Sequence, residues 1–194
     1  MIRRNKSVFF LVFALSFTQH LDACFGIRDK RKQQEALLKR KADAYEELGA
    51  LLHKARRTHF EKLPDKNMLI FVDIDGTLLS DNGKPITPVI KFCKDMKALG
   101  YTIIILSSRE KEGFNETEQE LETLGLEKAI TELILVPIEH YHTAKKSIGK
   151  WKAQQRREVS LRRNLPVAGV LDDRPENLQG DPEYLGYTVL IPEL

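Results

Sequence analysis

The chain has 194 residues, of which 42% are hydrophobic and 30% are charged, and this composition suits one ordinary globular domain with short additions. The length leaves no room for a second full domain. The formal net charge of +3 is unevenly distributed, because residues 1–26 carry +2, residues 27–62 carry +5 and residues 63–194 carry −4. The largest segment is therefore acidic, and there is no strong signal for a nucleic-acid partner.

Residues 1–26 have the layout of a secretory signal peptide. Three basic residues come first: Arg3, Arg4 and Lys6. The apolar run VFFLVFALSF follows at residues 8–17, and the small residues Ala23 and Gly26 mark a cleavage zone. A membrane-spanning helix needs about 20 apolar residues, so a permanent anchor is the less favoured alternative. We expect an exported protein, either periplasmic or secreted.

Cys24 lies in the segment LDAC, which resembles the bacterial lipobox, although Asp22 departs from that pattern. A lipidated Cys24 would become the new amino terminus and would associate the protein with a membrane. A single acyl chain binds membranes only marginally without a second signal. The other cysteine is Cys93, and we expect no disulfide.

Residues 29–60 predict one long amphipathic helix within a basic segment, residues 27–62. The stretch contains no proline, and apolar pairs recur every seven residues: Leu37-Leu38, Ala44-Tyr45 and Leu51-Leu52. We expect this helix to pack against the domain that follows. The alternatives are a coiled-coil seam, through which the chain would form homo-oligomers, and a membrane-surface helix beside a lipidated Cys24.

Residues 63–194 alternate between apolar runs and helical patterns. Strands are expected at residues 68–73, 101–107, 133–136, 167–172 and 188–191, and helices at residues 88–99, 115–124, 143–163 and 175–178. Continuous apolar strands that alternate with helices indicate a parallel sheet covered on both faces. The prediction is an α/β fold, a Rossmann-like three-layer α/β/α sandwich with a mainly parallel five-stranded sheet.

Polar residues follow three of these expected strands. They are Asp73 and Asp75, then Ser107, Ser108 and Arg109, and finally Asp172 and Asp173. In open parallel sheets, ligands bind beyond the carboxyl ends of the strands, so these side chains mark a candidate site.

Asp73 and Asp75 are two residues apart and can face the same small volume. Two carboxylates so close repel each other unless they share a cation or one is protonated. Mg²⁺ prefers oxygen ligands of this kind, whereas an Asp-Gly pair alone is also typical of a simple hairpin turn.

The segment DIDGTLL, residues 73–79, resembles the first motif of the haloacid dehalogenase superfamily, whose members are mostly magnesium-dependent phosphatases. The resemblance covers residues 68–194 and follows four motifs in order. It implies that Asp73 is the nucleophile and Asp75 the general acid and base. Gly76 and Thr77 come next, and we expect them to contact the substrate.

The second motif corresponds to IIILSSR, where the resemblance implies that Ser107 binds the phosphoryl group. Ser108 and Arg109 are then expected beside the substrate. The third motif is a lysine, and KWKAQQRREV is similar to the lysine-bearing helix of family phosphatases. This implies a catalytic Lys152. The alternative lysines are Lys145, Lys146 and Lys150.

The fourth motif is acidic and corresponds to VLDDRPENL, which implies that Asp172 is a metal ligand. The second acidic position is Asp173 or Glu176. The implied cofactor is Mg²⁺. Its expected ligands are Asp73, Asp75, Asp172, Asp173 and Glu176.

The intervals between the motifs are too short for a large cap domain, so the resemblance implies a minimal cap or none. The chain resembles exported acid phosphatases of this superfamily, and its SSR and DDRPEN segments also resemble the phosphatase half of polynucleotide kinase-phosphatases. The leading hypothesis is an exported Mg²⁺-dependent phosphatase acting on a phosphorylated substrate of unknown class. The alternatives are a polynucleotide or nucleotide end phosphatase and a noncatalytic scaffold of the same fold.

Overall fold

The computed structural model describes residues 27–139, 141 and 147–192. The predicted signal peptide, Cys24, Lys145 and Lys146 lie outside the described residues. The chain divides into two compact units, Met1–Leu38 and Lys39–Leu194, and the second contains the sheet. Helix α1 (Ile27–Thr58) confirms the long amino-terminal helix and continues across this boundary.

Five parallel strands form one sheet in the order β3-β2-β1-β4-β5. They are β1 (Leu69–Val72), β2 (Thr102–Glu110), β3 (Ile130–Val136), β4 (Val167–Asp172) and β5 (Tyr187–Leu190). Each lies within or beside an apolar run of the sequence, because strands buried on both faces need apolar residues at nearly every position. The predicted five-stranded parallel sheet is confirmed.

Within residues 63–139 and 147–192, three helices pack on the sheet. They are α2 (Thr87–Ala98), α3 (Phe114–Thr123) and α5 (Ile148–Arg163). Pro88 occupies the first turn of α2, where its missing N–H group has no intrahelical partner to lose. Asn164 ends α5 in the left-handed conformation that closes many helices. Short 3-10 helices occupy Phe60–Lys62, Lys111–Gly113, Pro175–Leu178 and Pro182–Tyr184.

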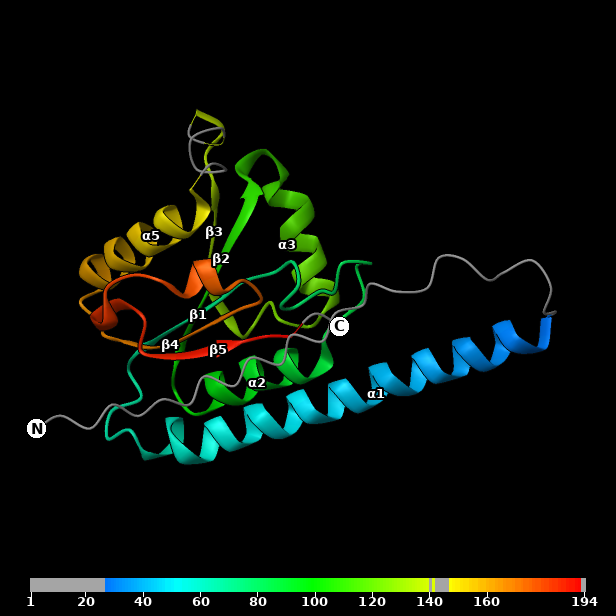
Figure 1. Cartoon of the computed structure of the whole chain (residues 1–194). Coiled ribbons are helices and arrows are strands. Elements are labelled where there is room, and N and C mark those ends of the chain that lie inside the picture. The colour runs from blue at the N-terminus through cyan, green and yellow to red at the C-terminus, as the bar shows by residue number, and fades with distance from the viewer. Residues whose placement is uncertain (1–26, 140, 142–146, 193–194) are drawn as a thin grey trace, which may run out of the picture. The chain divides into compact units, whose positions relative to one another are not determined.

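The two faces of the sheet carry separate hydrophobic layers. Ile70 and Val72 of β1 belong to the layer that contains residues of α1, α2 and α3. Leu69 and Phe71 belong to the opposite layer, which contains Val159 of α5. This alternation is the two-residue period of a strand. Figure 1 shows α5 on one side of the sheet and α2 and α3 on the other, which confirms the three-layer sandwich.

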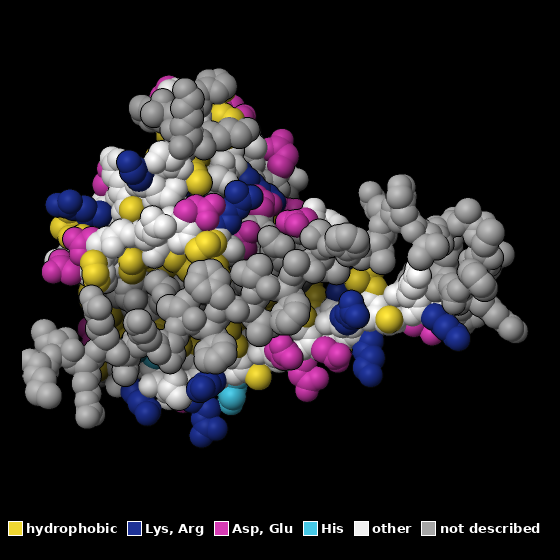
Figure 2. Space-filling view, viewed as in Figure 1, with side chains coloured by type: hydrophobic (Ala, Val, Ile, Leu, Met, Phe, Trp, Pro, Cys, Tyr) yellow, Lys and Arg dark blue, Asp and Glu magenta, His cyan; other side chains and the backbone are white. Residues whose placement is uncertain are grey.

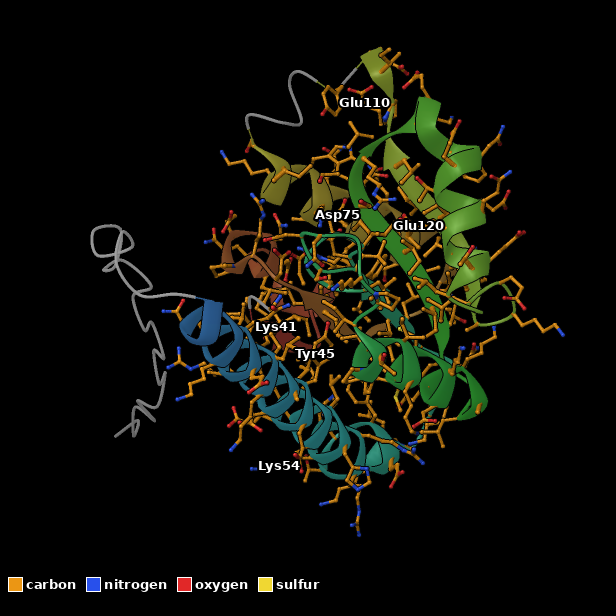
Figure 3. All side chains as sticks on the ribbon, turned by 90° about the vertical axis from the view of Figure 1, so that its right-hand side faces the viewer. Lys41, Tyr45, Lys54, Asp75, Glu110 and Glu120 are labelled. Carbon is orange, nitrogen blue, oxygen red and sulfur yellow. The ribbon has the colours of Figure 1, made fainter. Side chains whose placement is uncertain are left out.

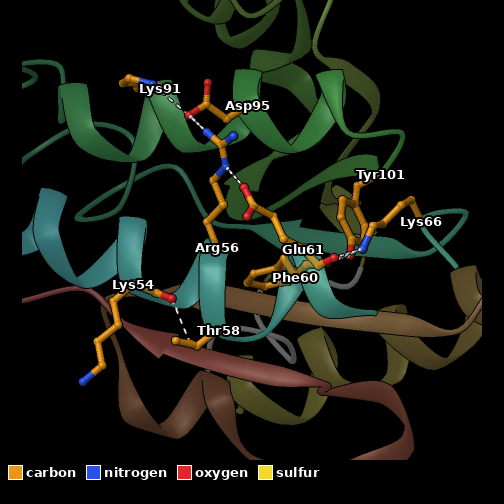
Figure 4. Close-up of polar contacts among 9 residues, drawn as sticks. All are labelled: Lys54, Arg56, Thr58, Phe60, Glu61, Lys66, Lys91, Asp95 and Tyr101. Atoms are coloured by element: carbon orange, nitrogen blue, oxygen red, sulfur yellow. Dashed lines mark hydrogen bonds and ion pairs between the residues drawn. The ribbon is translucent and has the colours of Figure 1, made fainter. Parts of the chain in front are cut away.

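The carboxyl-terminal part of α1 belongs to the same core as the sheet. Three of its side chains are at most 2% exposed: Leu48, Leu52 and Ala55. Arg56 pairs with Asp95 of α2 and with Glu61, each at 2.8 Å (Figure 4). The hydroxyl of Tyr101 donates to the carbonyl of Phe60 at 2.7 Å. The expected packing of this helix against the following domain is therefore confirmed.

None of the helices that the structure describes is long and apolar enough to cross a membrane. On the face shown in Figure 2, acidic and basic side chains lie interspersed over the described surface. The thiol of Cys93 is free and buried in α2, and burial raises its pKa to about 12.

Candidate active site

The candidate site lies at the carboxyl ends of β1 and β4, where the order of the sheet reverses. From β1 the chain continues to β2 and β3 on one side, and it returns to β4 on the other side of β1. Ligands of doubly wound sheets bind at such a switch point. Asp73 directly follows β1, and its amide donates to the carbonyl of Leu171 at 3.1 Å. Asp172 is the last residue of β4, so main-chain pairing places both carboxylates side by side.

Lys152 lies between these two carboxylates and is 1% exposed. Its Nζ atom is 2.7 Å from Asp172 Oδ2, to which it donates a hydrogen bond, and 2.9 Å from Asp73 Oδ1. Burial lowers the pKa of Lys152, but the charges of Asp73 and Asp172 outweigh it and leave the pKa raised. The ammonium group is therefore a fixed, buried positive charge. Lys150 is exposed, two residues earlier on the same helix.

Asp73 is 5% exposed. Burial raises its pKa to about 7, the charge of Asp172 adds to this rise, and Lys152 opposes it. The Oδ1 atom of Asp73 forms an ion pair with Lys152 and has no other polar partner within the described part of the chain. The carboxylate is thus desolvated and faces a buried ammonium, which is the kind of perturbed environment found at functional sites.

Asp172 is held more firmly. Its Oδ1 atom accepts hydrogen bonds from the amide of Arg174 at 3.0 Å and from Asn177 Nδ2 at 2.9 Å, while its Oδ2 atom faces Lys152. A carboxylate with this many donors has little freedom to move. Asn177 was not predicted from the sequence. Its position in the DDRPEN segment, five residues after Asp172, was the available signal.

Three carboxylates form a group whose oxygens lie within 4.8 Å of one another: those of Asp73, Asp172 and Asp173. Burial raises the pKa of Asp173 to about 6, with a further rise from Asp172, and its Oδ1 atom has no hydrogen-bond partner among the described residues. Three carboxylates and the ammonium of Lys152 leave a formal charge of −2. This donor set fits one Mg²⁺ ion. Asp75 and Glu176 lie outside the group, and Glu176 is exposed.

Gly76 lies against this acidic group in a conformation that suits glycine. Its φ angle is +76°, and a Cβ atom at this position would lie 2.4 Å from Asp173 Oδ2. Any larger residue would therefore move the Asp173 carboxylate. Gly76 contributes to the site through its backbone.

Replacing Gly76 by alanine should weaken divalent-cation binding about tenfold or more, because the new methyl group displaces a carboxylate and each tenfold loss corresponds to about 1.4 kcal/mol. Isothermal titration with Mg²⁺ or Mn²⁺ measures this. Gly83→Ala is the matched control, because Gly83 has a φ of +71° and nothing within 4 Å of its Cβ position. That variant should lose about 1 kcal/mol of stability through backbone strain and keep its cation affinity. Equal affinities for both variants would show that Asp173 is not a ligand.

Asp75 is half-exposed and paired with Arg109. Arg109 Nε donates to Asp75 Oδ2 at 2.9 Å, and Nη2 donates to Asp75 Oδ1 at 2.6 Å. The same guanidinium donates through Nη1 to Glu120 of α3 at 2.5 Å. Arg109, which was expected to contact the substrate, therefore binds Asp75, another predicted site residue.

The remaining predicted residues differ in exposure. Ser107 is fully buried and accepts a hydrogen bond from the amide of Arg109 at 3.3 Å. Ser108 is exposed. Thr77 is fully buried, and its hydroxyl has no partner among the described residues.

A pocket of about 220 Å³ opens beside Asp73 and Asp75. It is lined by Asp73, Asp75, Ser108, Val136, Tyr141, Ile148, Arg174 and Asn177. The first three were predicted from the sequence, and the other five were missed because they come from loops and element ends that only the fold brings together.

Arg156 was also missed. It lies one helical turn after Lys152, is 1% exposed, and donates to the carbonyl of Gln179 at 2.9 Å. Its Nε and Nη1 atoms have no hydrogen-bond partner in the described part of the structure. Burial lowers its pKa to about 10, and the charge of Asp172 opposes this. The basic run QQRRE was the signal in the sequence, but periodicity alone could not show which arginine points inward.

Residues 70–133 match the family model described as haloacid dehalogenase-like hydrolase. This segment contains Asp73, Asp75 and Ser107, whereas Lys152 and Asp172 lie beyond it. No curated protein matches the chain in a sequence search.

Proposed function

We propose that this chain is an exported, Mg²⁺-dependent phosphatase of the haloacid dehalogenase type that hydrolyses phosphate monoesters. The match of residues 70–133 to the haloacid dehalogenase-like hydrolase family supports this. The observation that supports this most is the buried arrangement of Asp73, Lys152 and Asp172 at the switch point of the sheet. A desolvated carboxylate beside a fixed ammonium suits a nucleophile that receives a dianionic group.

In the first half-reaction, a carboxylate oxygen of Asp73 attacks phosphorus and the bond to the leaving oxygen breaks. The product is an aspartyl-phosphate on Asp73. Lys152, 2.9 Å from Asp73, offsets negative charge on the transferring oxygens. Asp75, which lines the same pocket, supplies a proton to the leaving oxygen.

In the second half-reaction, a water molecule attacks the phosphorus of the aspartyl-phosphate. The bond between phosphorus and Asp73 breaks, Asp73 leaves as a carboxylate, and the proton of the water passes to the carboxylate of Asp75. The same residue thus works as acid in one step and as base in the next.

The metal would be held by Asp73, Asp172 and Asp173, whose oxygens already lie close together. When bound, Mg²⁺ supplies electrostatic stabilisation to a phosphoryl group. Asn177 and the amide of Arg174 keep Asp172 oriented for this role. Asp75 and Glu176 remain predicted ligands that this arrangement does not require.

Export is supported by the basic and apolar layout of residues 1–26. Mass spectrometry of the mature protein, after expression in a secreting host, tests export. It shows whether residues 1–26 have been removed. A mature protein that retains them and stays inside the cell would contradict export.

Hydrolysis of p-nitrophenyl phosphate tests the activity. We expect release of nitrophenolate and phosphate with Mg²⁺, a loss of about 100-fold or more after chelation, and recovery on adding Mg²⁺. Full activity after complete chelation would remove the metal from the proposal, and no activity on any phosphate monoester would remove the phosphatase. A panel of nucleotides, sugar phosphates, phosphopeptides and phosphorylated oligonucleotides then identifies the substrate class.

A further inference from the structure

The predicted substrate residue Arg109 makes its strongest contacts with side chains of the protein. It lies near the end of β2, and both of its side-chain contacts to Asp75 are hydrogen bonds of at most 2.9 Å. The pair is bidentate, which is the geometry that fixes a carboxylate in direction as well as in place. In Figure 3 the labelled Asp75 and Glu120 lie near one another at this edge of the sheet.

Glu120 completes the arrangement from α3. It accepts from Arg109 Nη1 at 2.5 Å, so the guanidinium is held from two elements at once. The hydrogen bond to Asp75, followed by the contacts with Glu120, raises the pKa of Arg109 above its usual range. Arg109 therefore stays charged. A movement that breaks its hydrogen bonds to Asp75 would also change its contact with Glu120.

The backbone of Arg109 joins this arrangement to the phosphoryl-binding residue predicted from the sequence. Its amide donates to Ser107 Oγ at 3.3 Å. Arg109 does not line the pocket that Asp73, Asp75 and Ser108 share. Arg109 contacts Asp75, which does line the pocket, so any effect of Arg109 on the reaction would pass through Asp75.

We infer that Arg109, held by Glu120, is the positioning residue that fixes the direction of the Asp75 carboxyl group toward the water of the second half-reaction. The inference rests on the proposed function, because it assigns a partner to the proton acceptor of that reaction. A guanidinium paired with both carboxyl oxygens limits rotation of the Asp75 side chain, and proton transfer from water requires the accepting oxygen to be in place. The first half-reaction depends less on this pair when the leaving group needs no proton.

The test separates the two half-reactions by rapid-quench kinetics with p-nitrophenyl phosphate and Mg²⁺. Nitrophenolate is a good leaving group, so the first turnover reports formation of the aspartyl-phosphate and the steady state reports its hydrolysis. Arg109→Met should keep the rate of the first turnover within about twofold and lower the steady-state rate about tenfold or more, because correctly placed proton transfer contributes factors of about 100 or more. The progress curve should then show a burst of about one nitrophenolate per active site.

Two further variants refine the outcome. Glu120→Gln should lower the steady-state rate in the same direction by a smaller factor, since Arg109 keeps Asp75 but loses its support. Guanidinium ion added to Arg109→Ala should restore part of the steady-state rate, which a purely structural defect would not allow.

Glu132→Gln is the matched control. Glu132 also accepts from arginines, Arg162 and Arg163, at 2.5 and 2.6 Å, but it lies away from the pocket. It should leave the ratio of first-turnover to steady-state rates unchanged.

The results that overturn the inference are distinct from those that overturn the proposed function. Equal losses in both rates, or a raised KM with an unchanged ratio, would show that Arg109 contacts the substrate or only supports the fold. Full activity in Arg109→Met would show that Asp75 does not need Arg109. A wild-type protein that releases no phosphate would overturn the proposed function and this inference with it.

Discussion

Asp73→Asn should lose about 10⁴-fold or more of the phosphate-release rate while remaining folded. The amide has the same shape as the carboxylate but is a far weaker nucleophile, and removing an essential nucleophile costs several kcal/mol of transition-state stabilisation. Lys152 keeps its hydrogen bond to Asp172 in this variant. Because burial and Asp172 already raise the pKa of Asp73 to about 7, a neutral side chain should be tolerated there. The measurement is phosphate release at saturating substrate, together with the unfolding midpoint.

Asp81→Asn is the control for that experiment. Asp81 is exposed and lies in the same connection between β1 and β2. Its substitution should leave the rate of phosphate release within about twofold, since exposed side chains away from a site rarely affect it. Equal activity of Asp73→Asn and the wild type would refute the assignment of the nucleophile.

Lys152→Met should lower the free energy of unfolding by about 3 kcal/mol in the absence of metal, because it leaves two buried carboxylates without their shared cation. Added Mg²⁺ should recover more stability in this variant than in the wild type, since the ion offsets the same negative charge. Catalysis should also fall by about 100-fold or more through the lost electrostatic stabilisation. Urea unfolding with and without Mg²⁺, together with phosphate release, measures all three effects.

Lys150→Met provides the comparison on the same helix. Lys150 is exposed, so its substitution should change the free energy of unfolding by about 0.5 kcal/mol or less. If both lysine variants unfold at the same urea concentration, the buried ion pairs of Lys152 do not stabilise the fold.

The sheet and the first carboxylates could be predicted because short-range patterns determine them. An apolar run such as residues 69–72 must be covered on both faces, and Asp73 follows it directly, so its place at the sheet edge depends on only a few residues. The order of the strands then brings Asp73 and Asp172 together without any further information from side chains.

Partners that meet across long sequence distances could not be predicted in the same way. Arg109 contacts Asp75, 34 residues away, because the end of β2 and the turn after β1 converge in the fold. A motif indicates that an arginine is near the site but not which oxygen it contacts. The expected packing of the amino-terminal helix against the following domain is confirmed by the buried Leu52, but its amphipathic pattern did not show which core residues it meets.

The most direct test of the account is to trap the covalent intermediate on Asp73. The protein is incubated briefly with a phosphate monoester and Mg²⁺, quenched with acid, reduced with borohydride and digested for mass spectrometry. An aspartyl-phosphate at this position would be reduced to homoserine, so the predicted result is homoserine at position 73, absent without substrate and absent from Asp73→Asn. Phosphate release by the wild type with an unmodified Asp73, or with phosphate on another side chain, would contradict the account.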